Sequence, residues 1–418
     1  MTYTHRIIVA LVICTSPLTT FCQQDSTGKP GGFVQQDIKD WLVQHHWTKP
    51  KTEKNNFLLI LPIVASNPTA GFIYGAGLSY AFQAFPGGRF SSATANASYS
   101  SKHVLNLNVK SNAFAVDDRL VLNGDWRYQI NSETTYGLGS KKYPGSYINI
   151  NGYQVAKDSI GQPLQYTLIR LYETASWKII PNLFAGIGFH YDNYFNIKDQ
   201  TVQDGDTAFS FHYQYSRHYG FNPDSYVATG FSANLLFDNR DNQVNAYKGY
   251  YANVNYRVNF TGLGSSRGSS MLLTEYRSFH SLDGGKNRNI LAFWFYGNFV
   301  TSGEVPYLLL PAIGYDQRQR TGRGYTFGRF RGEDLLYAES EYRFPISART
   351  GILGGVAYVN LTSTNDRFQN VALLEYIRAG YGGGLRVMLD KKTRTRLEID
   401  AGIAGKNIGF YLGAQETF

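Results

Sequence analysis

Polar and apolar residues alternate with a period of two along most of this chain. In GYYANVNYRVN, residues 249–259, every second residue from Tyr250 to Val258 is Tyr, Ala or Val, and the residues between them after Tyr251 are Asn or Arg. In TRTRLEIDAGI, residues 393–403, Leu, Ile and Ala likewise alternate with Arg, Glu and Asp. Such a period predicts β-strands with one apolar and one polar face.

The alternating runs are mostly about ten residues or longer, whereas strands of soluble sandwiches have roughly five or six. Their number is even, and Tyr, Phe and Trp gather near their ends, as in the aromatic girdles of membrane barrels. Because lipid offers no partner to backbone polar groups, such strands must close on themselves. We therefore predict an all-β fold, a 16-stranded antiparallel transmembrane β-barrel over residues 57–418. The predicted strands are 57–66, 70–82, 91–100, 103–113, 119–130, 164–178, 182–196, 226–238, 248–260, 269–282, 288–301, 335–346, 351–361, 377–389, 393–403 and 407–418.

The connections between these strands differ in length in a regular way. If the chain enters from the periplasm, every long connection falls outside and the inner turns are short, which is the asymmetry of membrane barrels. The last residue, Phe418, is predicted to end the final strand. The long connections are 131–163, 197–225, 302–334 and 362–376.

Composition agrees with this fold. The 418 residues include 32 Tyr, 27 Phe and 43 Gly, and the mean hydropathy is −0.30. No segment offers the ~20 consecutive apolar residues of a spanning helix. The net charge of +9 is spread along the chain. We expect no nucleic-acid partner, and we assign the charge to a basic lumen or to anionic lipid head groups of an outer-membrane bilayer.

Residues 1–22 are predicted to be a cleaved signal peptide. Arg6 precedes a short apolar run, and Thr20 and Cys22 are the small residues before a cut at Gln23. Acylation of Cys22 is the less favoured alternative because Phe21 is too bulky for the position before a lipidated cysteine. Both cysteines of the chain lie in this segment, so we expect neither a disulfide nor a thiolate metal site.

Residues 23–56 form a short polar segment, expected in the periplasm. FVQQDIKDWLVQHHW, residues 33–47, is its one candidate amphipathic helix. The segment has three open roles: it plugs the barrel, lies on the membrane or binds a partner.

Three short motifs suggest chemistry, and none has the context that the chemistry needs. Gly264–Gly268 reads G-x-S-x-G, but the nucleophile elbow requires a strand before it and a helix after it. His45 and His46 are adjacent, so they do not share a helix face. Asp238–Asn242 lacks the spaced oxygen ligands of a calcium loop and is expected to be a charged turn. We predict no catalytic residue, no metal and no cofactor, and hence no enzyme.

The remaining candidate is GRGYTFGRFRGEDLLYAESEYRFPI, residues 322–346. Here Gly322, Arg323, Gly324 and Tyr325 precede a strand whose polar file carries alternating charges. The glycines allow close approach of the backbone to the barrel wall. An arginine inside the barrel is expected to pair with Glu341 and fix the loop.

This pattern resembles the BamA/TamA family of outer-membrane assembly barrels, the bacterial surface antigen family. In that family the sixth outer loop folds into the lumen with a V/I/L-R-G-F/Y motif, and here Arg323-Gly324-Tyr325 follows the eleventh predicted strand. The opening hairpin from Leu58 and the closing strands GYGGGLRVMLD and TRTRLEIDAGIAG are also similar. The resemblance covers 57–418, and residues 23–56 are too short for a periplasmic POTRA domain, which points to a POTRA-less branch.

The resemblance implies that Arg323 pairs with acidic groups on the twelfth and thirteenth strands. Glu341 matches the first of these groups. Asn360 stands where the F-x-D-x-G pattern of the family has Asp, so it can accept a hydrogen bond but supplies no charge. Glu339 or Asp400 would supply the missing charge if the loop sits lower.

The resemblance further implies a role in outer-membrane protein insertion or surface transport. The route would be a seam between the first strand, FLLILPIVASN, and the last, IGFYLGAQETF, where Pro62, Gly409 and Gly413 weaken pairing. A periplasmic or secreted protein would be partner or substrate. The alternative is a passive pore or a structural outer-membrane protein, because fold does not fix function.

Overall fold

A computed structural model of the protein describes residues 34–50, 54–67, 71–141, 147–150, 153–156, 160–205, 207–283 and 289–418. The predicted signal peptide lies outside these residues.

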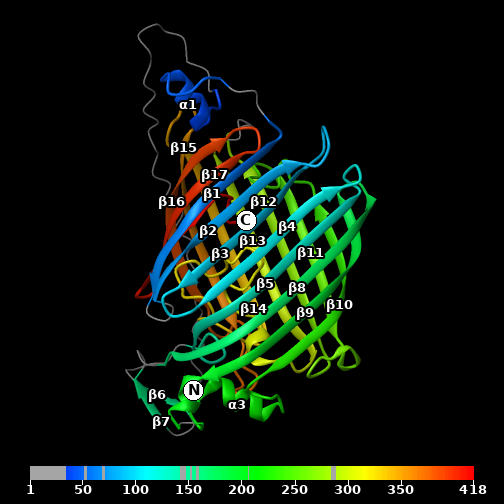
Figure 1. Ribbon diagram of the computed structural model, residues 1–418, viewed down its shortest axis with the longest axis vertical. Helices are drawn as coiled ribbons and strands as arrows, with labels where there is room; N and C mark the ends of the chain where they lie inside the picture. The colour runs from blue at the N-terminus through cyan, green and yellow to red at the C-terminus, as the bar shows by residue number, and fades with distance from the viewer. Residues whose placement is uncertain are drawn as a thin grey trace, which may run out of the picture.

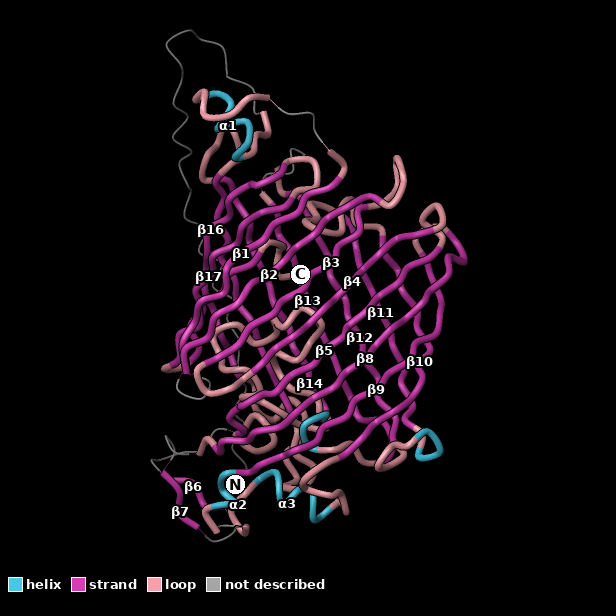
Figure 2. The backbone as a smooth tube through the Cα atoms, in the orientation of Figure 1, coloured by secondary structure: helices cyan, strands magenta, loops and turns pink. Residues whose placement is uncertain are grey.

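Sixteen antiparallel strands form one sheet, and Figures 1 and 2 show that the sheet curls into a barrel. Neighbours in the sheet are also neighbours in sequence, apart from a separate hairpin inserted after β5. The prediction of sixteen antiparallel strands is therefore confirmed. The strands of the sheet are β1 (Asn56–Asn67), β2 (Gly71–Gln83), β3 (Phe90–Ser100), β4 (Leu105–Ala115), β5 (Leu120–Thr135), β8 (Gln162–Ile180), β9 (Leu183–Asp199), β10 (Tyr226–Asp238), β11 (Gly249–Asn259), β12 (Ser269–Ser281), β13 (Ile290–Gly303), β14 (Asp334–Pro345), β15 (Leu353–Thr364), β16 (Arg378–Asp390), β17 (Thr395–Ala404) and β18 (Asn407–Gly413).

The two ends of the barrel differ. The helix α1 (Ile38–Gln44) lies at one end, and the long connections gather at the other, with the hairpin β6 (Tyr147–Ile150) and β7 (Tyr153–Ala156) and the helix α3 (Phe211–His218) (Figure 1). We call these the inner and the outer end. None of the described helices is long and apolar enough to cross a membrane. The remaining short helices are α2 (Gln200–Gln203), η2 (Thr261–Leu263) and η3 (Tyr307–Leu309).

The polarity of the barrel is the reverse of that of a soluble protein. On β11, Val254 points outward and is 41% exposed, whereas Arg257 points inward and is 5% exposed. On β14, Glu341 and Arg343 are buried, while Tyr342 between them is exposed. An apolar outer face around a charged lumen suits an apolar solvent such as lipid.

An apolar cluster lies near the outer end of the barrel. It joins residues of β8–β10 to α3 and to the segment 305–310. The Tyr215 hydroxyl of α3 donates to the Val305 carbonyl at 3.0 Å, and burial raises the pKa of Tyr215 so that the phenol stays neutral. The cluster contains Leu164, Tyr166, Leu168, Tyr194, Ile197, Tyr215, Phe221, Tyr226, Ala228, Met271, Val300, Val305, Tyr307, Leu308, Leu309 and Leu310.

The last strand is shorter than predicted. β18 ends at Gly413, and residues 414–418 turn into the lumen. There Phe418 is 2% exposed, and the centroid of its ring lies 5.4 Å from that of Trp294. Ile408, Phe410 and Leu412 face outward, so a strand continued with the same period would point Glu416 outward as well. The charge of Glu416 therefore favours the inward turn.

The two edges of the sheet face each other without a continuous ladder. Among the described strands, β1 pairs along its whole length with β2, and β18 pairs with β17. Gln415, just after β18, donates to the Ser79 hydroxyl of β2 at 3.5 Å, which brings the edges together. We call this junction between β1 and β18 the seam.

The outward apolar face can be tested by placing a charge on it. We expect Val254→Arg to destabilise the folded protein in a bilayer by about 2–4 kcal/mol if the position lies near the bilayer centre. The neighbouring Asn253 lines the lumen, so Asn253→Arg is the matched control and should change stability much less. Urea unfolding in lipid vesicles measures both, and equal effects of the two variants would contradict the assigned faces.

Candidate functional site

The long connection 304–333 between β13 and β14 enters the lumen and carries Arg323 to the wall. The Arg323 side chain is fully buried, and it donates to Glu339 at 2.6 Å and to Asp400 at 2.8 Å. It also forms an ion pair with Glu341. The guanidinium thus links Glu339 and Glu341, which share the inward face of β14, to Asp400 on β17. A planar fork with five N–H donors suits this three-carboxylate arrangement.

The wall around the guanidinium also contributes an aromatic face. The Tyr358 ring of β15 lies 3.5 Å below the guanidinium carbon of Arg323. A guanidinium over a ring face is attracted by the quadrupole of the ring. Arg323 therefore contacts three strands, β14, β15 and β17.

Two glycines let the loop backbone reach the wall. Gly322 and Gly324 have φ values of 78° and 100°, in the region that favours glycine. A Cβ on Gly324 would lie 2.9 Å from the carbonyl carbon of Ile403. The Gly324 amide donates to the Tyr411 hydroxyl of β18 at 2.8 Å. Any side chain at position 324 would push the loop away from β17 and β18.

Asn360 contacts the loop in a different way from that expected. Its side-chain amide donates to the Arg323 backbone carbonyl at 3.0 Å and does not accept from the guanidinium. The third carboxylate comes from Asp400 on β17. Tyr325, the last residue of the motif, donates its hydroxyl to the Ala379 carbonyl of β16 at 2.8 Å. The structure thus brings together all eight residues singled out in the sequence.

Arg323 belongs to a larger charge network that the sequence did not indicate. Asp400 is shared with Arg386, and Arg386 donates to Glu416 of the inward-turned tail at 2.8 Å. Arg343 forms an ion pair with Glu341 at 2.7 Å and donates to the backbone oxygen of Phe418 at 3.2 Å. The side chains of the network are five arginines and five carboxylates: Arg320, Arg323, Arg343, Arg386 and Arg396 with Glu339, Glu341, Glu398, Asp400 and Glu416.

A second arginine of the same loop fixes its outer part. Arg331 is 1% exposed and donates to Glu133 of β5 at 3.0 Å. It also donates to the Tyr307 and Leu308 carbonyls at 3.1 and 3.0 Å. The sequence places Arg331 in the G-x-x-R-G run that follows the Arg323 motif, but no strand pattern marks Glu133 as its partner. The loop is therefore tied to opposite parts of the wall.

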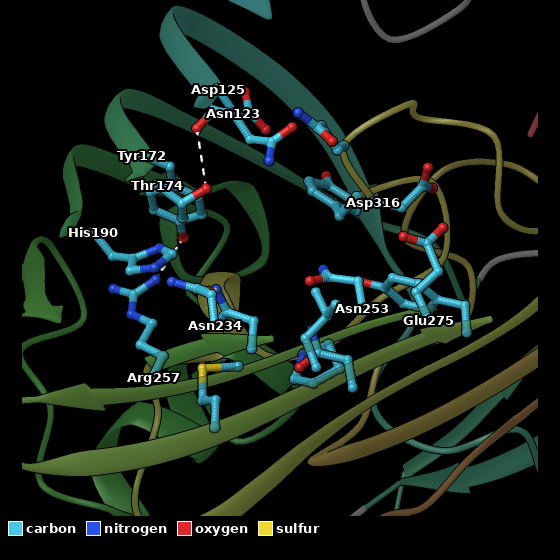
Figure 3. A pocket seen from close by; sticks show the side chains of 18 of the residues that line it. Asn123, Asp125, Tyr172, Thr174, His190, Asn234, Asn253, Arg257, Glu275 and Asp316 are labelled. Carbon is cyan, nitrogen blue, oxygen red and sulfur yellow. Dashed lines mark hydrogen bonds between the residues drawn. The ribbon is translucent and has the colours of Figure 1, made fainter. Parts of the chain in front are cut away.

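A cavity of about 200 Å³ remains between the loop and β5–β13 (Figure 3). Its wall is polar, and most of its charged side chains form ion pairs. Arg257 pairs with Asp192 at 2.9 Å, and Arg127 pairs with Asp125 at 2.6 Å. Figure 3 shows Asn234 and Asn253 among the neutral side chains that face this space. The cavity resembles a solvated pocket more than a ring of one charge that would select ions.

The other motifs from the sequence have structural roles. Ser266, the serine of the G-x-S-x-G run, lies in the β11–β12 connection, where its hydroxyl accepts from the Val227 amide at 3.0 Å. Asp238 and Arg240 form an ion pair at 2.7 Å in the β10–β11 turn at the inner end, as predicted. His45 packs on the Trp41 ring with centroids 4.3 Å apart.

Comparison with solved structures identifies the architecture. BamA from Haemophilus ducreyi lacking POTRA domains 1–3 matches with a TM-score of 0.52 and 14% sequence identity, over 87% of this chain and 69% of that one. The fold is that of BamA-type barrels. CdiB from Acinetobacter baumannii matches with a TM-score of 0.50 and 12% identity, over 86% of this chain and 60% of that one. No protein-family model and no curated protein matches the sequence.

Replacing Arg323 should release the loop. Arg323→Ala leaves Glu339, Glu341 and Asp400 buried without that counter-charge, and breaking a buried ion pair costs about 3–5 kcal/mol. We expect a lower free energy of unfolding and faster proteolysis within 304–333. Arg323→Lys should be intermediate, because one ammonium cannot bridge three carboxylates with the geometry of a guanidinium.

The matched control is Arg267→Ala. Arg267 lies in another outer connection and is exposed. If Arg323→Ala and Arg267→Ala are both cleaved within 304–333 at the rate of the wild-type protein, Arg323 does not hold the loop.

Proposed function

We propose that this protein is a non-catalytic outer-membrane barrel that inserts or translocates other proteins. The observation that carries the proposal is the seam, because β1 and β18 share no ladder among the described strands. The unpaired backbone groups of an edge strand are a template for another strand. The inverted polarity and the fold shared with BamA and CdiB support the location. The ligand class would be an extended segment of a protein substrate.

We further propose that Arg323 couples the lumen loop to the seam. Arg323 binds Asp400 on β17, and the adjacent Gly324 binds Tyr411 on β18, which is one edge of the seam. Displacement of the loop would free β18 from these contacts. In this proposal Arg323 anchors the closed state, with Glu339, Glu341, Asn360 and Asp400 as its partners in the wall.

A passive pore is the competing function, and the lumen argues against it. The loop 304–333 enters the lumen, an apolar cluster packs on it near the outer end, and most charged side chains around the remaining cavity form ion pairs. We expect low, flickering conductance in planar bilayers, and higher conductance for Arg323→Ala. A large, steady and ion-selective current from the wild-type protein would favour the pore.

Depletion in cells tests the function directly. We expect selective loss of other barrels or surface proteins from the outer-membrane proteome. Wild-type protein should restore them, Arg267→Ala should do so equally well, and Arg323→Ala should do so poorly at equal abundance. A proteome that changes only in the depleted protein would contradict a role in insertion or transport.

A further inference from the structure

The segment before the barrel is attached to the inner turns of the last strands. α1 begins after Asp37, whose carboxylate accepts from the Lys39 and Asp40 amides at 2.9 and 3.0 Å. Asp40 in turn accepts from the Asp37 amide at 3.1 Å, which completes a capping box. The helix has only seven residues, so its attachment to the barrel is needed to stabilise it.

Two turns hold the segment. The Val34 and Gln36 amides donate to the Arg349 and Thr350 carbonyls of the β14–β15 turn at 3.1 and 2.8 Å. These backbone hydrogen bonds do not depend on side-chain charge. They fix the chain just before α1 on the inner rim.

Ion pairs hold α1 itself to the β16–β17 turn. The Lys391 ammonium donates to both Asp40 carboxylate oxygens at 3.0 Å, and the Lys391 amide donates to Asp37 at 3.0 Å. The Lys39 ammonium pairs with Asp390. In one pair the lysine belongs to the helix and the carboxylate to the end of β16; in the other the lysine belongs to the turn and the carboxylate to the helix. This arrangement sets the orientation of α1 as well as its position.

The same Lys39 also reaches the other side of the seam. Its ammonium lies 4.7 Å from the centroid of the Phe57 ring, at the start of β1. One side chain therefore contacts both the first strand and the turn between β16 and β17.

The ladder of the last strand stops short of the inner end, which is the end where α1 lies (Figure 1). The β17–β18 register ends at the pair Glu398 and Gly413, so Thr395, Arg396 and Leu397 of β17 have no partner from β18 at the inner end. The tail after Gly413 has turned into the lumen. At this end the sheet edges are thus joined by contacts of α1 and its flanking chain.

We propose that α1 is a clasp that holds the inner end of the seam closed. It contacts Phe57 at the start of β1 through Lys39, and it is bound to the β14–β15 and β16–β17 turns. Separation of β1 from those turns at this end breaks the contact of Lys39 with Phe57 or the contacts of Lys39 and Lys391 that hold α1 to the β16–β17 turn. The inference rests on the seam of the proposed function, but it concerns the motion of β1 and is measurable without any substrate.

Charge reversal tests the clasp. In the full chain in lipid nanodiscs, Lys39→Glu with Lys391→Glu should speed hydrogen–deuterium exchange of the β1 amides by about two- to thirtyfold, the range given by two partly exposed ion pairs. Exchange in the β10–β11 hairpin should not change. The control is Lys54→Glu with Lys248→Glu, which makes the same charge change at exposed positions. Unchanged exchange in β1, or equal acceleration by the control, would overturn the proposal.

A covalent lock provides the opposite perturbation. Both cysteines of the chain lie in the predicted signal peptide, so Asp40→Cys with Lys391→Cys gives a single pair in the mature protein for a short bis-maleimide linker. The linked form should exchange β1 amides more slowly than the unlinked form, and an equal rate would overturn the clasp. The two proposals can fail independently. If depletion leaves other outer-membrane proteins unchanged but the exchange rates of the β1 amides respond to these variants, the proposed function is wrong and the clasp stands.

Discussion

A guanidinium removed from water has to be matched by carboxylates, and this constraint organises one side of the barrel. Arg323 enters the lumen on a loop, so its charge is neutralised only if the loop reaches Glu339, Glu341 and Asp400 together. Removing one partner from a buried ion pair leaves an uncompensated charge. The loop conformation and the spacing of β14, β15 and β17 are therefore fixed by the same contact. The glycines around Arg323 follow from this closeness, since a Cβ at position 324 would collide with β17.

The same charge balance explains how the chain ends. Asp400 is shared by Arg323 and Arg386, and Arg386 is further neutralised by Glu416. The tail must enter the lumen for Glu416 to reach Arg386, which shortens β18 and leaves part of β17 unpaired. Charge neutralisation in the lumen thus stabilises an incomplete ladder at the edge of the sheet. An unpaired edge is unfavourable in lipid, so the gain inside the barrel offsets a loss at the seam.

The parts of this structure that were predictable from sequence are those with a local signal. The period of two located all sixteen strands, because each strand has one face toward the lumen and one away from it. Glu339 and Glu341 were accessible for the same reason, as they share a face of one strand. The tail had only one local signal, the charge of Glu416 on the face that would point outward, and its partners Arg386 and Arg343 are too distant in the sequence to be recognised. The role of Asn360 could not be predicted either. Its side-chain amide donates to the Arg323 backbone carbonyl, and this contact depends on the path of residues 322–325, which the sequence does not reveal.

Three sets of contacts lie near the seam, and they differ in where they lie along the barrel and in how they are held. The Arg323 contacts reach β17 and β18 within the lumen, the tail crosses from β18 to Ser79 of β2, and α1 joins β1 to the turns at the inner end. Elsewhere in the barrel, neighbouring strands are joined by continuous backbone ladders. Buried charges hold the first contact and a neutral hydrogen bond forms the second, whereas partly exposed lysines hold the third. Exposed ion pairs are weak and sensitive to salt, so the clasp proposed at the inner end is the contact of the three that salt should weaken most.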